Sequence, residues 1–352
     1  MCVAATMLLL LAAAAAAAGA AAAAPPLLFE GDRCQTRGGQ QGECRLFESC
    51  RSALEDFQQR SLEPRRCSFK GSRVVVCCAD PVPRLSPSQE ACLSYSNEVP
   101  LRVNPLILGG TAADIGEFPH MAALGYVRSG SREVSWDCGG SLISDRYVLT
   151  AAHCASNSRR RLAVVRLGGT DLEARDDNSQ QLAVDKVVPH PSYGKGYHDI
   201  ALVRLAAAVR FATNVLPACL YREPEEPRRG LTVAGWGATD ALGETKSRYL
   251  MKATVESVPL GRCNQTYARA GRALRYGVTA DMVCAYDPDG VQDTCRGDSG
   301  GPLQTVTGEW SNMMSVVGVT SMGPALCGSS EPAVYTRVSS YVAWIEGVVW
   351  PQ

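Results

Sequence analysis

A serine flanked by glycines and preceded by an aspartate gives the clearest chemical signal in this chain, in the segment Gly297–Pro302 (GDSGGP). A serine hydroxyl is a weak nucleophile at neutral pH, so a reactive Ser299 needs a base to take its proton and a carboxylate to orient that base. Both are present, because His153 stands in the segment LTAAHC and Asp199 in the segment YHDIAL. The sequence therefore predicts Ser299 as a nucleophile, His153 as its base and Asp199 as the residue that orients His153.

The surroundings of Asp199 favour this role over that of a solvated surface charge. The apolar residues 200–203 follow it directly and are expected to carry its carboxylate toward the interior. An unpaired buried charge is costly, and His153 would supply the hydrogen-bond donor that Asp199 needs. The remaining histidines lack a comparable setting and are expected to be structural: His120, His190 and His198.

From Ile107 onward the chain resembles the chymotrypsin-type serine proteases. The resemblance rests on the three segments in the order His, Asp, Ser, on Gly235-Trp236-Gly237, and on Tyr335–Val338. It implies an all-β fold, a chymotrypsin-like double β-barrel. His153 and Asp199 would lie on the first six-stranded barrel and Ser299 on the second, with the site in the cleft between them. It also implies a trypsin-like serine endopeptidase with residues 107–352 as its protease domain.

The hydrophobic pattern predicts the elements that must position these residues. Residues 161–167 and 231–235 are short apolar runs between glycine and polar turns, which predicts strands. Apolar residues at helical spacing between 338 and 345 predict a C-terminal helix, which we expect to pack on the second barrel.

The N-terminal region is predicted to hold a leader and a small cysteine-rich domain. Residues 1–24 are apolar and end before Pro25-Pro26, which is typical of a signal peptide and favours it over an alanine-rich membrane anchor. Residues 30–80 are polar and hold six cysteines, and disulfides would supply the stability that so small a core cannot. The pairing stays open at this point. A zinc site is the alternative, but this segment has no histidine.

The cysteine spacing and the final Cys77-Cys78 resemble the clip domain of arthropod proteases. Of the 15 cysteines, Cys2 would leave with the signal peptide, and an even number remains, which suits an oxidising compartment. The resemblance implies three pairs within the clip domain: Cys34–Cys77, Cys44–Cys67 and Cys50–Cys78. It implies one pair that joins the linker to the protease domain, Cys92–Cys219. It implies three more within that domain: Cys138–Cys154, Cys263–Cys284 and Cys295–Cys327. The Cys92–Cys219 bond would keep the clip domain attached after a cut between them.

Residues 81–106, with several prolines, are expected to form an extended linker and activation segment. The linker ends at Leu106, before Ile107-Leu108-Gly109-Gly110. In the family, such a new amino terminus folds inward onto the aspartate before the nucleophile. The resemblance therefore implies a cut between Leu106 and Ile107, a pairing of Ile107 with Asp298, and an oxyanion hole formed by the amides of Gly297 and Ser299.

The family pattern also implies a specificity pocket. Asp293 would lie at its floor, where a buried carboxylate favours Arg or Lys at the cleaved bond. Its walls would be formed by Ser321, Met322 and Gly323 on one side and by 332–334 on the other. Ala333 departs from the family's usual glycine, and its methyl is expected to crowd Asp293, which leaves the preference between Arg and Lys open.

Composition narrows the function further. Lys+Arg 35 balance Asp+Glu 35 without a basic cluster, so neither nucleic acid nor a membrane is expected as a partner, and no cofactor is implied. Asn264-Gln265-Thr266 is a glycosylation sequon. The acidic residues of loop 171–177 stand where some relatives bind calcium, but a solvated loop is the better interpretation.

Together these features predict a secreted zymogen in a proteolytic cascade. Leucine before the activation bond resembles the snake and persephone type of clip protease, which implies an upstream activating protease, a downstream clip-protease zymogen and a serpin inhibitor. The pathway stays open between Toll-type immune or developmental signalling and melanization. Two alternatives remain: a catalytically silent homologue that acts as a binding cofactor, although its catalytic residues are all kept, and a digestive trypsin, which has no evident use for a clip domain.

Overall fold

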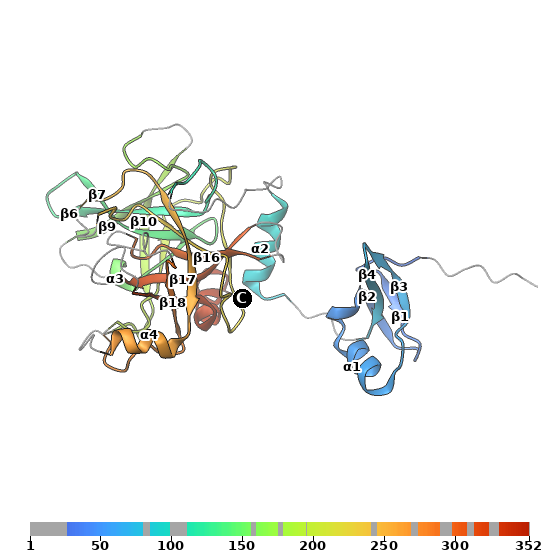
Figure 1. Ribbon diagram of the computed structural model, residues 1–352. Coiled ribbons are helices and arrows are strands. Elements are labelled where there is room, and N and C mark those ends of the chain that lie inside the picture. Colours follow the sequence, from blue (N-terminus) through green and yellow to red (C-terminus); the bar gives the residue numbers. More distant parts are fainter. Residues whose placement is uncertain are drawn as a thin grey trace, which may run out of the picture. The chain divides into compact units, whose positions relative to one another are not determined.

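Figure 1 shows the protein as a computed structural model, whose chain divides into two compact units, Met1–Arg84 and Leu85–Gln352. The structure describes residues 27–79, 85–98, 111–155, 160–174, 179–194, 196–240, 245–268, 274–288, 298–307, 313–323 and 331–351. Each unit buries clusters of apolar residues of its own. The predicted signal peptide and the predicted cut after Leu106 lie outside the described residues.

In its described residues, 27–79, the N-terminal unit is a four-stranded antiparallel sheet with one α-helix. The strands lie in the order β1-β2-β4-β3 (Figure 1). Its elements are β1 (Arg33–Gln35), β2 (Gln41–Leu46), η1 (Phe47–Ser49), α1 (Arg51–Arg60), β3 (Arg66–Lys70) and β4 (Arg73–Cys78). Six of the ten buried residues in its two apolar clusters are cysteines, and only a few aliphatic side chains such as Val75 and Val76 join them. A core this small needs covalent cross-links to be stable.

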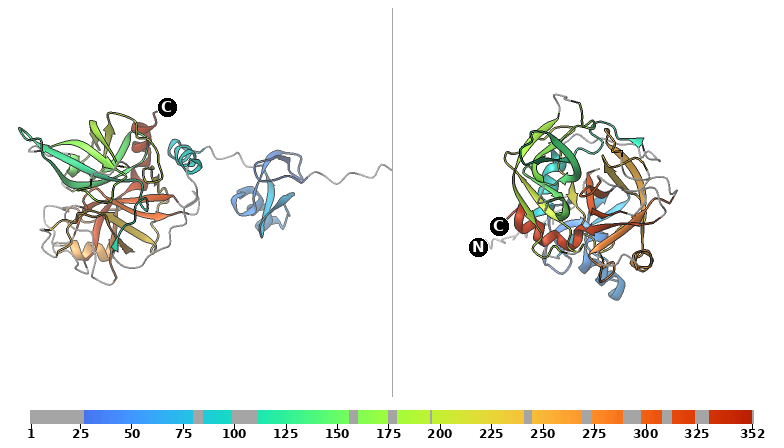
Figure 2. Two further views of the ribbon diagram at one scale, coloured as in Figure 1. Left: turned by 90° about the horizontal axis from the view of Figure 1, so that it is seen from above. Right: turned by 90° about the vertical axis from the view of Figure 1, so that its left-hand side faces the viewer.

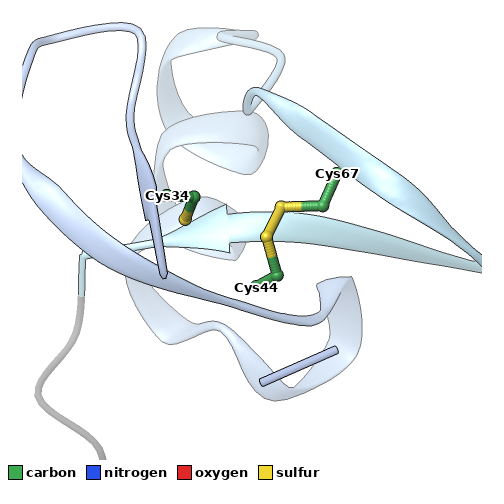
Figure 3. A group of neighbouring side chains, drawn as sticks. All are labelled: Cys34, Cys44 and Cys67. Atoms are coloured by element: carbon green, nitrogen blue, oxygen red, sulfur yellow. A yellow bond between two sulfur atoms is a disulfide. The ribbon is translucent and has the colours of Figure 1, made fainter. Parts of the chain in front are cut away.

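Three disulfides cross this small core and pair Cys34 with Cys77, Cys44 with Cys67, and Cys50 with Cys78. These are the pairs that the resemblance to a clip domain implies. Figure 3 shows the bonded sulfurs of Cys44 and Cys67 next to that of Cys34, a grouping that would otherwise resemble a metal site. Because a metal binds the thiolate form of cysteine, sulfurs held in disulfides offer it no ligand.

The first barrel of the C-terminal unit is a closed ring of six strands in the order β10-β11-β8-β7-β6-β9. The strand predicted at 161–167 is β9, which is confirmed. Its interior is aliphatic, with Leu124, Leu149 and Leu202 fully buried. The strands are β6 (Met121–Arg128), β7 (Val134–Leu142), β8 (Tyr147–Thr150), β9 (Arg160–Leu167), β10 (Gln180–Pro189) and β11 (Ala201–Leu205).

The second barrel also closes with six strands, because β17 pairs with both β16 and β18. In Figure 2 its yellow-to-red strands lie beside the green strands of the first barrel. The strands are β13 (Leu231–Gly235), β14 (Met251–Val258), β15 (Met282–Tyr286), β16 (Pro302–Val306), β17 (Met314–Met322) and β18 (Ala333–Arg337); the short β5 (Thr111–Ala112) and β12 (Cys219–Leu220) join β14 and β17. The all-β double barrel predicted from the sequence is thereby confirmed.

The predicted C-terminal helix forms as η3 (Val338–Tyr341) and α5 (Val342–Val349), and it packs on residues of both barrels rather than on the second alone. Its buried residues Val338, Tyr341 and Ile345 share one apolar cluster with the interior of the first barrel and with two β17 residues of the second, Val316 and Val319. Helical spacing showed that one face is apolar, but it carries no information on which barrel covers that face. Among the described residues, no helix is long and apolar enough to cross a membrane.

The linker before the protease domain is not extended throughout, which corrects the prediction from its prolines. Residues Pro87–Asn97 form the helix α2, and Cys92 of this helix is bonded to Cys219 of β12. Ser86 and Gln89 form a capping box, with Pro87 in the first turn, where proline is tolerated. This start signal was present in the sequence and was missed because the prolines were taken together.

A buried histidine links the two barrels and gives the fold a testable pH dependence. His120 is 1% exposed, and its Nε2 lies 2.5 Å from Oε1 of the fully buried Gln304. Burial lowers the pKa of His120 to about 4 from 6.5, against the opposing effect of the Gln304 contact. The folded state therefore holds a neutral imidazole where the unfolded state would take up a proton.

Stability from His120 is fully present above the unfolded pKa and is lost as the pH falls from about 6.5 toward about 4. The expected loss is about 3 kcal/mol of unfolding free energy. We expect the variant His120→Gln to show a flatter decline than the wild type in urea unfolding between these pH values. Equal declines in both proteins would show that His120 is not the source.

Candidate active site

The candidate base and its carboxylate are joined by two hydrogen bonds. His153 lies on α3 (Ala152–Ala155), one turn after β8, and Asp199 ends the connection from β10 to β11. Nδ1 of His153 lies 2.7 Å from Oδ2 of Asp199, and the His153 backbone N–H donates to Oδ1 at 2.8 Å. The carboxylate therefore accepts a hydrogen bond from Nδ1–H, which leaves Nε2 as the nitrogen that can accept a proton. Asp199 is 3% exposed, so the carboxylate is carried inward as the sequence predicts.

Two residues of the second barrel hold Asp199 from the other side. Ser321 of β17 donates its hydroxyl to Oδ2 of Asp199 at 2.6 Å, and Thr336 of β18 donates to the Asp199 carbonyl at 2.9 Å. The Asp199 carboxylate thus accepts three hydrogen bonds, which compensate for its burial. The sequence predicts Ser321 in a pocket wall but does not reveal this contact, because a serine within a strand carries no signal of its partner.

The candidate nucleophile lies in a tight turn at the start of β16. Gly300 has φ +79°, and a Cβ on it would lie 2.1 Å from Oγ1 of Thr150 and 2.6 Å from the carbonyl oxygen of Gly139. Only glycine fits both this backbone and this close approach to the first barrel. The Ser299 carbonyl accepts from the Gly139 N–H at 2.8 Å and lies 3.6 Å from Sγ of Cys154. The Ser299 backbone therefore lies beside Cys154, the residue that follows His153.

Asp298 is turned away from this turn toward the segment Gly235-Trp236-Gly237. Its Oδ1 accepts from the Gly237 N–H at 2.8 Å. A Cβ would lie 2.0 Å from the carboxylate at Gly235 and 2.2 Å at Gly237, so both positions need glycine. The sequence indicates these glycines only as part of the resemblance to the protease family. The structure adds their contact with Asp298. The predicted partner Ile107 lies outside the described residues.

Several predicted pocket and oxyanion residues, Asp293 and Gly297 among them, lie outside the described residues, as does the Cys295–Cys327 pair. Ser321 and Met322 end β17, Gly323 follows, and Ala333 begins β18. Ala333 is fully buried and belongs to the apolar core of the second barrel. Cys138 is bonded to Cys154 next to His153, and Cys263 is bonded to Cys284 elsewhere in the second barrel.

Two peripheral predictions meet specific contacts. The Asn264 side chain bonds the backbone of Val278 through both Nδ2 and Oδ1, at 3.0 and 2.7 Å, so the amide that would carry a glycan is already engaged. Glycosylation there stays a prediction.

In the acidic loop, Arg248 pairs with both Asp171 and Glu173 at 2.7 Å, so a guanidinium neutralises these carboxylates. This pairing favours the solvated interpretation; residues 175–178 of the loop lie outside the described residues.

The model of one protein family, Trypsin, matches residues 107–345. The chain belongs to the trypsin family of serine proteases. The match begins at Ile107, the residue at which the sequence places the start of the protease domain. It spans the three candidate catalytic residues and both barrels, so the trypsin-family chain is a serine protease.

Relatives of this trypsin-family chain include insect clip-domain proteases. It is 36% identical to serine protease snk of Drosophila melanogaster over 353 residues, covering 92% of this chain and 80% of that protein. Phenoloxidase-activating factor 3 of Holotrichia diomphalia is 34% identical over 90% of this chain and 93% of its own. CLIP domain-containing serine protease B4 of Anopheles gambiae is 31% identical over 91% and 92%. The similarity therefore includes the N-terminal region.

Among solved structures, mouse neuropsin, a serine protease, matches with a TM-score of 0.56 and 31% sequence identity. The match covers 69% of this trypsin-family chain and 100% of neuropsin. It supports the double-barrel fold of the protease domain.

Proposed function

We propose that this chain is a secreted protease zymogen that is cut between Leu106 and Ile107 and then cleaves a downstream protease zymogen after Arg or Lys. The observation that carries the catalytic part is the pair of hydrogen bonds from His153 to Asp199, next to the Ser299 turn. This arrangement fixes the imidazole in the tautomer that can accept a proton from Ser299.

The proposed mechanism assigns one task to each residue. Nε2 of His153 takes the Ser299 proton as Oγ attacks the substrate carbonyl, and it later returns the proton to the leaving amine. Asp199 stabilises the imidazolium that forms in between. The amides of Gly297 and Ser299 bind the oxyanion, each donor contributing roughly 3 kcal/mol to transition-state stabilisation. Water then hydrolyses the acyl-enzyme by the same route.

Activation is proposed to act through Asp298. A free Ile107 amino group would pair with its carboxylate, which the structure holds against the Gly237 amide. This pairing would fix the backbone of the two residues that flank Asp298, Gly297 and Ser299. Removing one partner of a buried ion pair typically costs about 3 to 5 kcal/mol, enough to keep the uncut chain inactive.

Specificity and activation together suggest a middle position in a cascade. A pocket with Asp293 at its floor would not accept Leu106, so another protease would have to cut there. The insect relatives, one of them named a phenoloxidase-activating factor, support a cascade of the immune, melanization or developmental kind. The disulfide-rich N-terminal unit supports secretion, because such bonds persist in oxidising compartments. A serpin would be the expected inhibitor.

The test is a chain in which an enteropeptidase site replaces residues 102–106, so that cleavage frees Ile107. After cleavage, we expect hydrolysis of peptide amides with Arg or Lys before the bond and about a hundredfold less with Leu or Asp there. Incubation with candidate clip-protease zymogens, followed by amino-terminal sequencing, would identify the downstream substrate. The matched control is Ser299→Ala in the same chain.

Two results would contradict this proposal. A chain that sequencing shows to begin at Ile107 but that hydrolyses nothing would favour the binding-cofactor alternative. Equal cleavage of leucyl and arginyl amides would contradict the pocket proposed around Asp293.

A further inference from the structure

The residue before Asp199 has a backbone conformation that needs support. His198 has φ +52°, one of only two non-glycine positive φ values in the described chain. The Ile200 N–H donates to the His198 carbonyl at 2.8 Å, which closes a tight turn around Asp199. A side chain in this left-handed region is unfavourable and persists only where its surroundings enforce it. The turn that sets the direction of Asp199 is therefore strained.

The His198 side chain ends in a directed chain of hydrogen bonds. Nδ1 of His198 lies 2.8 Å from the Tyr341 hydroxyl, and that hydroxyl donates to Oδ2 of Asp281 at 2.7 Å. Tyr341 is 5% exposed, and burial followed by its bond to Asp281 raises its pKa, so it keeps its proton. Because this one proton goes to Asp281, the Tyr341 oxygen must accept from Nδ1–H of His198.

This series of hydrogen bonds joins a loop of the first barrel to residues of the second barrel and of η3. His198 lies in the connection between β10 and β11, whereas Asp281 precedes β15 and Tyr341 lies on η3. Nearby, the Tyr197 hydroxyl donates to the Gly277 carbonyl at 3.0 Å. The His190 ring stacks on His198, with centroids 5.3 Å apart, and burial followed by the nearby His198 lowers the pKa of His190. Contacts on both sides thus hold the strained turn.

We propose that His198 is a positioning residue for Asp199, held by Tyr341 and Asp281 so that the Asp199 carboxylate stays aimed at His153. This proposal rests on the catalytic role proposed for Asp199. Sequence reasoning assigned His198 to structure alone, because its partners are distant in the chain. Loss of the hydrogen bonds from His198 through Tyr341 to Asp281 would let the turn around Asp199 relax. The contact of Asp199 that stabilises protonated His153 would then weaken.

The test compares His198→Ala, Tyr341→Phe and His198→Asn in the full chain cut before Ile107, with an arginyl amide as substrate. In the alanine and phenylalanine variants we expect kcat to fall about tenfold to a hundredfold, with KM within about twofold. The acidic limb of their kcat/KM profile should move to lower pH by about half a unit, because His153 loses part of the stabilisation of its charged form. The groups that face His198 and titrate are His190, Asp281, Tyr341 and Asp199.

The variant His198→Asn should keep kcat and the acidic limb of the kcat/KM profile near their wild-type values. Asparagine adopts positive φ readily, and its amide can donate to Tyr341. The matched control is Tyr221→Phe. It removes a hydroxyl that donates to the Glu225 carbonyl and takes no part in the hydrogen bonds of His198, so kcat and the pH profile should stay unchanged. Unshifted profiles in His198→Ala and Tyr341→Phe, or no rescue by asparagine at equal melting temperature, would overturn this proposal alone. An inert wild type would overturn the proposed function and this proposal with it.

Discussion

In the cut enzyme, Asp199→Asn is expected to lower kcat about 10,000-fold. The carboxylate accepts three hydrogen bonds, from the ring and the backbone of His153 and from Ser321. A carboxamide has only one acceptor oxygen, so it cannot satisfy all three donors and it presents an N–H group to one of them. If that group faces Nδ1, His153 must adopt the tautomer with its proton on Nε2, which cannot take a proton from Ser299.

The measurement is kcat for an arginyl amide, beside the melting temperature of each variant. The matched control is Asp185→Asn on the surface, where the carboxylate pairs with Arg204, and it should keep kcat within about twofold. A cut Asp199→Asn enzyme that is folded and retains a tenth or more of the wild-type kcat would show that Asp199 does not orient the base.

Disturbing Asp298 is expected to remove activity without touching the three catalytic residues. In the cut chain, Asp298→Asn should lower kcat by about 100-fold to 1,000-fold, the effect of losing one oxyanion donor. Gly237→Ala should act in the same direction, because its Cβ would lie 2.2 Å from Oδ2 of Asp298 and displace the carboxylate. In both variants the amides beside Asp298 would no longer be held toward the oxyanion.

Gly261→Ala in the helix α4 (Leu260–Tyr267) is the matched control for the glycine change, since a Cβ there meets no atom within 4 Å. It should retain full activity. The same kcat assay applies, with amino-terminal sequencing to show that every variant begins at Ile107. Full activity of cut Asp298→Asn would contradict the proposed coupling between activation and the oxyanion hole.

The candidate catalytic residues could be proposed from sequence because catalysis restricts residue type at each position. His153, Asp199 and Ser299 stand in short segments whose order and neighbours agree with one mechanism, and the structure pairs His153 with Asp199 and places the Ser299 backbone beside Cys154. The strands at 161–167 and 231–235 followed from local hydrophobic pattern in the same way.

What sequence did not predict depends on contacts between distant parts of the chain. The bond from Ser321 to Asp199, the contact of Asp298 with Gly237 and the pairing of His198 with Tyr341 join residues that only the folded barrels bring together. The surface on which the C-terminal helix α5 packs could not be predicted for the same reason, because it too depends on contacts with distant residues. The helix α2 is different, because its capping box is local and could have been recognised.

Labelling with a fluorophosphonate tests the central claim most directly, because this reagent bonds only to an activated serine hydroxyl. The chain with an enteropeptidase site in place of residues 102–106 would be labelled before and after cleavage, and the modified peptide located by mass spectrometry. We predict one label per cut chain, on Ser299, and little or none on the uncut chain. Equal labelling of both forms, or no label on Ser299 in a chain that begins at Ile107, would contradict it.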